Sequence, residues 1–185
     1  MGAGPAADYT LWMAGEAPVG GLMKQPEEAA KMGAPPSWLA VLRDPQGAVF
    51  AVMRSANPMP EENDPQPLEF SWHELVVTDA VSGLEFYKTL FGWEKKAEHD
   101  MGPMGAYHMF GRDRFTYGGT YDKPAEMPAS YWLHYVRVKD SADAAADRAK
   151  AAGAQVLAGP MEVPGGDRIA VIMDPQGAAF AVHSK

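Results

Sequence analysis

The chain has 185 residues, a formal net charge of −8 and no cysteine, with 46% hydrophobic and 22% charged residues. This composition is typical of globular proteins and excludes disorder, and the missing cysteines exclude disulfide frameworks, thiolate zinc sites and cysteine nucleophiles. The acidic balance argues against nucleic-acid binding, and no apolar stretch is long enough to cross a membrane. The N-terminus has neither a basic start nor an apolar core, so we expect no signal peptide and a cytoplasmic protein.

A nine-residue sequence occurs twice in the chain. Residues 44–52 recur as residues 174–182 with a single difference, and Trp38-Leu39 recurs as Trp132-Leu133. Such self-similarity indicates two copies of one module. The copies are unequal, because the first lacks the segments that carry both long helices of the second.

The first copy is therefore predicted to be a reduced module over residues 1–56. Its strands are expected near 8–13, 17–23, 38–43 and 48–54, with a helical turn over 27–31. Because about 56 residues rarely bury enough surface to fold alone, we expect this half to dock on the rest of the chain or on a second copy. Residues 57–68 are rich in proline and acidic side chains and predict a linker.

Residues 69–185 are predicted to be a complete domain with an inner repeat. A strand beginning at Trp72 ends at Asp79, which is suited to cap a helix over 80–91 that stops at Gly92. A second strand from Leu133 likewise ends at Asp140, which is predicted to cap a helix over 141–152 that stops at Gly153. That helix carries an alanine stripe of Ala142, Ala145, Ala149 and Ala152, which would let it lie close to a sheet.

Short strands follow each helix, near 106–111 and 115–121 in the first half and near 155–158, 168–173 and 178–183 in the second. The Asp-Pro-Gln-Gly sequence over 174–177 predicts a β-turn. The fold class is thus α+β, with a βαβββ unit that occurs twice.

These motifs resemble the vicinal oxygen chelate superfamily of glyoxalases, bleomycin-resistance proteins and extradiol dioxygenases. The resemblance rests on the strand–Asp–helix start over 72–79, the helix end over 86–93 and the closing turn over 174–177. More narrowly, the chain is similar to tandem-domain glyoxalase-like proteins. The resemblance implies paired βαβββ modules that form a curved mixed sheet around a cavity, with the helices on the outer face. It also implies a divalent metal and a lyase or dioxygenase activity.

The metal-ligand positions implied by this resemblance hold no ligands here. They fall on Trp72, Leu133 and Ala181, and the first copy has Ala51 at the last of these positions. An indole and aliphatic side chains cannot bind a hard cation, so we expect no cofactor. A divalent metal held by the displaced pair Glu74 and His183 is the alternative. Since His73 and His134 lie one residue beyond the ligand positions, strand alternation points them to the opposite, helix-facing side.

Alternation also predicts which side chains point into the cavity. Glu74 and Arg137 would form either a structural ion pair or the catalytic residues, with Glu74 as a general base and Arg137 holding an oxyanion. Phe110, Tyr117 and Tyr121 could add aromatic walls. No Ser/His/Asp triad is supported by the order of residues. The predicted ligand-binding residues are Trp72, Glu74, Tyr107, Leu133, Tyr135, Arg137, Ala181 and His183.

Three functions remain open on the sequence. The favoured one is metal-independent binding of a small apolar or aromatic metabolite, and the sequence does not decide whether the protein is an enzyme. The alternatives are a divalent-metal lyase or dioxygenase with displaced ligands, and a non-catalytic assembly module. The expected partners are a small-molecule ligand and a second copy in a homodimer, with no nucleic acid and no membrane.

Overall fold

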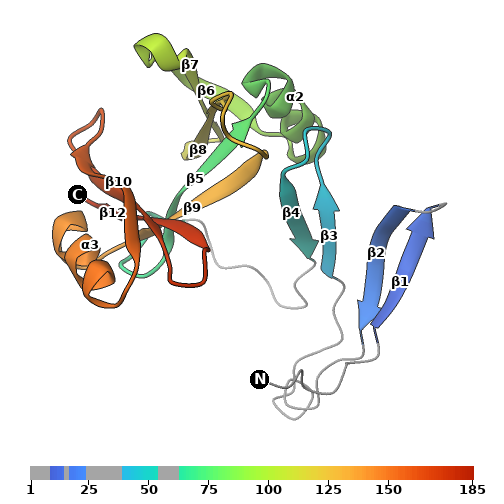
Figure 1. Cartoon of the computed structure of the whole chain (residues 1–185). Helices are drawn as coiled ribbons and strands as arrows, with labels where there is room; N and C mark the ends of the chain where they lie inside the picture. Colours follow the sequence, from blue (N-terminus) through green and yellow to red (C-terminus); the bar gives the residue numbers. More distant parts are fainter. Residues whose placement is uncertain (1–8, 15–16, 24–38, 54–62) are drawn as a thin grey trace. The chain divides into compact units, whose positions relative to one another are not determined.

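The computed structural model describes residues 9–14, 17–23, 39–53 and 63–185 (Figure 1). The chain divides into two compact units. Unit 1 comprises residues 1–44 and 49–61, and unit 2 comprises residues 45–48 and 62–185. Each unit is described by itself.

Unit 1 contains two antiparallel hairpins. Strands β1 (Tyr9–Ala14) and β2 (Ala17–Met23) form one, and β3 (Leu39–Arg43) and β4 (Val49–Met53) form the other. The four strands expected in the first copy are confirmed to within a residue or two. The helical turn expected over 27–31 lies outside the described residues, and the docking of this half stays a prediction.

Unit 2 is built on one sheet of eight strands, in the order β10-β11-β12-β9-β5-β8-β7-β6. In chain order its elements are β5 (Phe70–Val77), α2 (Ala80–Phe91), β6 (Glu94–Asp100), a 3₁₀ turn (Gly102–Met104), β7 (Ala106–Arg112), β8 (Phe115–Asp122), β9 (Tyr131–Arg137), α3 (Ala142–Ala151), β10 (Gln155–Glu162), β11 (Arg168–Met173) and β12 (Ala179–Ser184).

The sheet has an internal two-fold repeat. Its two central strands, β5 and β9, pair antiparallel, and each pairs in parallel with the last strand of its own half, β8 or β12. The remaining pairs are antiparallel. The α+β class and the repeated βαβββ unit in a curved mixed sheet are therefore confirmed.

Helix α2 begins and ends where the sequence predicts. The Asp79 side chain accepts a hydrogen bond from the Ser82 backbone N–H, and Gly92 ends the helix in the left-handed conformation at φ 70°. Tyr87 is buried beneath the helix, and its hydroxyl accepts a hydrogen bond from Trp132 Nε1 of β9 at 3.1 Å.

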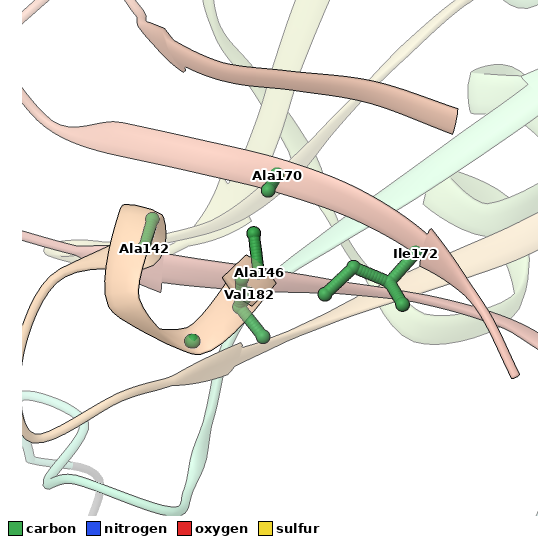
Figure 2. Close-up of a cluster of buried hydrophobic side chains, with 6 residues drawn as sticks. Ala142, Ala146, Ala170, Ile172 and Val182 are labelled. Atoms are coloured by element: carbon green, nitrogen blue, oxygen red, sulfur yellow. The ribbon is translucent and has the colours of Figure 1, made fainter. Parts of the chain in front are cut away.

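Helix α3 packs closely on β11 and β12 through small residues. Figure 2 shows Ala142 and Ala146 of the helix beside Ala170, Ile172 and Val182 of the strands. The predicted stripe is partly wrong, because Ala146 is buried whereas Ala152, beyond the helix, is exposed.

The cap of α3 also differs from the prediction. The N-cap is Ser141, which accepts from the Ala144 N–H, whereas Asp140 pairs with both guanidinium nitrogens of Arg148.

Both helices cover the same face of the sheet. Trp132 of β9 contacts α2. Val136, four residues further along β9 and on the same face, lies beside Val182, which packs in the core beneath α3. Since side chains alternate along a strand, Leu133 and Tyr135 point to the opposite side. We call that side the helix-free face.

Two edge strands differ from the prediction. The strand β6 is absent from the predicted set, because its sequence Glu-Lys-Lys-Ala-Glu-His-Asp is almost wholly polar. Charged residues with lysines are typical of exposed edges, which must not pair with other chains. At the other edge, β10 continues past Gly159-Pro160 with register shifts on either side of Ala158, where the sequence predicts an end at residue 158.

Candidate functional site

A partly buried carboxylate, that of Glu74, lies on the helix-free face of the central strand β5. Tyr107 Oη donates to one Glu74 oxygen at 3.0 Å, and Tyr135 Oη donates to the other at 3.1 Å. Trp72 Nε1 in turn donates to Tyr107 Oη at 2.8 Å. Hydrogen bonds from β7 and β9 thus converge on Glu74 of β5, and Trp72 of β5 holds the Tyr107 hydroxyl in place. The predicted placement of these four side chains on one face agrees with the structure.

Gly119 makes the Tyr107 contact possible. Glu74 lies opposite Gly119 in the parallel β5–β8 pair, and Tyr107 must reach Glu74 across β8. A Cβ atom at residue 119 would lie 2.0 Å from Tyr107 Cε1 and 2.4 Å from its hydroxyl oxygen. Because Gly119 has no side chain, the Tyr107 ring can lie over β8 and reach Glu74 on the next strand. Sequence reasoning gave this glycine no role.

Two further tyrosines flank Glu74. Tyr121 on β8 and Tyr131 on β9 both lie beside Val76, and Tyr121 stacks on Tyr107 with ring centres 6.0 Å apart. We call the six residues Trp72, Glu74, Tyr107, Tyr121, Tyr131 and Tyr135 the Glu74 cluster. Only Tyr135 among them is fully buried, at 4% exposure. The remaining five are partly open to solvent.

Burial sets the electrostatics of this cluster. It raises the pKa of Glu74, because desolvation disfavours the charged carboxylate, although the hydrogen bonds from Tyr107 and Tyr135 oppose the shift. Burial, followed by the negative charge of Glu74, raises the pKa of Tyr107, Tyr121 and Tyr135. The same two causes raise the pKa of Tyr131. The tyrosines are therefore neutral hydrogen-bond donors at ordinary pH.

The other aromatic walls proposed from the sequence are wrong. Phe110 stacks on Trp93 with ring centres 4.8 Å apart, and Tyr117 contacts Trp93 at 6.1 Å. Trp93 also stacks on Tyr87 of α2. Phe110 and Tyr117 therefore belong to the core beneath the helix.

The predicted ion pair between Glu74 and Arg137 does not form. Arg137 lies on the same strand face, but its Nη1 donates to the Pro65 carbonyl at 2.6 Å. Glu74 lies opposite Leu133, four residues from Arg137 along β9, and accepts its hydrogen bonds from tyrosines instead. Arg137 therefore anchors the segment that leads into β5, and its predicted role toward an oxyanion stays a prediction.

His183 is held by two groups that sequence reasoning did not connect to it. Its Nδ1 lies 2.9 Å from Ser71 Oγ, and its Nε2 lies 3.0 Å from Asp167 Oδ2. Ser71 is the extra residue at the register shift between Phe70 and Trp72, and such a bulge re-aims side chains. The structure thus brings a serine, a histidine and an aspartate together, a grouping that the order of residues along the chain did not indicate. The trio links β5, β12 and the turn before β11.

The histidines beside the ligand positions lie on the other side of the sheet, as predicted. His73 and His134 are opposite each other across β5 and β9, with their Nδ1 atoms 2.9 Å apart. The His134 ring stacks on Trp132, which contacts α2. Burial, with a smaller contribution from the charge of His134, lowers the pKa of His73 to about 4, and burial lowers the pKa of His134.

Comparison with known proteins identifies the family. Residues 69–182 match the sequence profile of the Glyoxalase/Bleomycin resistance protein/Dioxygenase superfamily. The chain belongs to this superfamily. Its matched region coincides with the eight-stranded sheet and its two helices, so the superfamily domain is the part of the chain that carries the Glu74 cluster.

Similar proteins include two curated relatives. The anthracycline biosynthesis protein DnrV of Streptomyces peucetius is 35% identical over 130 residues, which cover 62% of this chain and 46% of that protein. The putative glyoxylase CFP32 of Mycobacterium bovis is 29% identical over 144 residues, which cover 78% of this chain and 54% of that protein. The chain thus spans about half the length of these relatives.

Solved structures of other proteins share the fold of this domain. Methylmalonyl-CoA epimerase from Mycobacterium tuberculosis matches with a TM-score of 0.51 and 14% identity, covering 67% of this chain and 92% of that chain. A Streptomyces coelicolor methylmalonyl-CoA epimerase variant in complex with 2-nitronate-propionyl-CoA matches with a TM-score of 0.51 and 16% identity, covering 65% of this chain and 96% of that one.

The metal that superfamily resemblance implies does not fit the residues present. Leu133 and Ala181, at 3% and 0% exposure, pack with Trp72 in one apolar cluster at the implied ligand positions. Both Glu74 oxygens accept from tyrosines, and both His183 nitrogens have partners. Among the described residues, no group of three or more histidine, aspartate or glutamate side chains is placed to hold a metal. A displaced Glu74–His183 metal pair is therefore not assembled here.

Within the described part of the chain, none of the helices has both the length and the apolar character that a membrane span requires.

Proposed function

We propose that this chain binds a small aromatic or apolar molecule on the helix-free face of its sheet, without a metal ion. The observation that carries the proposal is the Glu74 cluster, in which aromatic side chains surround one carboxylate and stay partly open to solvent. Small-molecule sites usually combine an apolar lining with a few convergent polar groups. The cluster has this composition.

The chemistry that this face offers a bound molecule is proton transfer at Glu74. A carboxylate whose pKa is raised by burial is better matched to neutral pH as a general base than an exposed one. Tyr107 and Tyr135 orient both of its oxygens. Similarity to a protein named for anthracycline biosynthesis supports an aromatic ligand class, since anthracyclines are polycyclic aromatic compounds.

Thermal unfolding of the chelator-treated chain tests the proposal. The experiment adds neutral aromatic probes such as 2-naphthol to the wild type, to Tyr121→Ala and to the control Glu126→Gln. A ligand at 100 times its Kd stabilises the native state by about 2.7 kcal/mol. We expect stabilisation of the wild type and the control, and its loss in Tyr121→Ala, which removes an open aromatic wall of the cluster.

Three results would overturn the proposal. The first is equal stabilisation of the wild type and Tyr121→Ala. The second is no stabilisation by any probe, which would favour the assembly-module alternative. The third is stoichiometric zinc, nickel, iron or manganese in the protein purified without chelator, bound through Glu74 and His183.

A further inference from the structure

Within residues 63–185, no cationic side chain pairs with Glu74. None of the ion pairs among the described residues includes it, and its side-chain hydrogen bonds there come from the neutral hydroxyls of Tyr107 and Tyr135. A carboxylate removed from water without a positive charge nearby is costly, and a paired one is much less so. Among the described residues, therefore, no positive charge compensates Glu74 when its carboxylate is ionised.

The carboxylate also has hydrogen-bonding capacity left. An ionised carboxylate offers about four acceptor positions, and the two tyrosine hydroxyls occupy two of them. Glu74 remains partly exposed, so a donor on a bound molecule can approach the free positions. A ligand N–H could donate to these free positions, and a compact positive charge on the ligand could pair with the carboxylate of Glu74.

The surrounding rings favour the same kind of group. Four tyrosines and one tryptophan lie in the cluster, and the charge of Glu74 acts on all four tyrosines. The negative face of an aromatic ring attracts a cation, by roughly 0.5–2 kcal/mol for each well-placed ring. A neutral ligand can donate a hydrogen bond to the carboxylate but gains no charge–charge attraction, and an anionic ligand is repelled by it.

We propose that the molecule bound at the Glu74 cluster carries a cationic nitrogen, a protonated amine or a quaternary ammonium, which sits against the Glu74 carboxylate among the tyrosine rings. This inference rests on the proposed function and specifies its ligand class. The aromatic or apolar body of the ligand would lie along Trp72, Leu133 and the neighbouring apolar side chains.

A pair of matched probes tests the inference. The cation (3-hydroxyphenyl)trimethylammonium and its neutral carbon counterpart 3-tert-butylphenol have the same shape and differ in charge. Binding to the full chain is followed through the indole N–H signal of Trp72 in a ¹H–¹⁵N NMR spectrum, assigned with Trp72→Phe. We expect the cation to bind at least tenfold more tightly to the wild type and to Glu126→Gln.

Two variants localise that preference. In Glu74→Gln the preference should fall below about threefold. Tyr131→Leu removes one ring but leaves the carboxylate, so it should weaken the cation alone and leave 3-tert-butylphenol unaffected. This second variant keeps the test decisive where Glu74→Gln does not fold.

The contrary outcomes distinguish failure of the cation inference from failure of the proposed function. Equal affinity of the two probes, or a preference that survives in Glu74→Gln, overturns the cation inference and leaves the proposed function standing. Failure of both probes to move the Trp72 signal overturns the cation inference and counts against the proposed function as well.

Discussion

Replacing Gly119 by alanine should disconnect Tyr107 from Glu74. The added Cβ would lie 2.0 Å from the Tyr107 ring, whereas carbon atoms in contact are about 3.5–4.0 Å apart. The ring must therefore move by roughly 1.5 Å. Its hydroxyl would then leave hydrogen-bond range of both Trp72 and Glu74, which now lie at 2.8 and 3.0 Å.

The size of the effect follows from the two lost bonds. A neutral hydrogen bond contributes about 1 kcal/mol to stability and one to a charged group about 1.5–3 kcal/mol, so Gly119→Ala should cost about 2.5–4 kcal/mol. Urea denaturation measures this cost. The main chain is not the source of strain, because Gly119 is not among the residues with positive φ.

A double-mutant cycle isolates the cause. In a Tyr107→Ala background the space beside residue 119 is empty, so adding Gly119→Ala should change the free energy of unfolding by less than about 0.5 kcal/mol. A slight gain is also compatible, since glycine weakens a strand relative to alanine by roughly 0.5–1 kcal/mol. The same large cost in both backgrounds, or a negligible cost in the wild type, would refute the reasoning.

Three other changes have defined outcomes. Burial raises the pKa of Glu74 above its ordinary value of 4.5, so the folded chain binds more protons than the unfolded chain just above pH 4.5. The free energy of unfolding should therefore fall as the pH rises from 4.5 through the raised pKa. Glu74→Gln should remove this fall in urea titrations. His73 has the opposite sign, because its pKa of about 4 lies below the ordinary 6.5; stability should decline as pH drops from 6.5 toward 4, and His73→Gln should flatten that decline. Ala146→Leu should destabilise by about 1–3 kcal/mol through overpacking beneath α3, whereas Ala152→Leu at an exposed position should stay within about 0.5 kcal/mol, and equal costs would contradict the packing described.

Much of the fold could be predicted because its signals are local. Helix α2 is bounded by Asp79 and Gly92, which cap it through their own side chain and backbone conformation. The polar strand β6 gave no such signal, because its pairing depends on β7 rather than on its own apolar pattern. The prediction that Asp140 caps α3 was wrong, because Ser141 is the N-cap residue and the Asp140 carboxylate pairs with Arg148 instead.

Only part of the candidate site could be predicted from local sequence signals. Alternation along β5 and β9 placed Glu74 and Tyr135 on one face, but it could not supply the cross-strand partners. Those depend on register: Gly119 opposite Glu74 admits Tyr107, and the bulge at Ser71 turns that serine toward His183. Opposite charges on one face suggested a Glu74–Arg137 pair, yet Arg137 lies four residues from Leu133, the residue opposite Glu74, and each group has another partner.

The most direct test of metal-independent binding is a ¹H–¹⁵N NMR map of the chelator-treated chain during titration with 3-tert-butylphenol. The account predicts that signals shift first at the Trp72 indole N–H and at the backbone amides of Glu74, Gly119 and Tyr135, with no metal added. Shifts confined to the helix-covered face around His73 and α3, or shifts that require an added divalent cation, would contradict it.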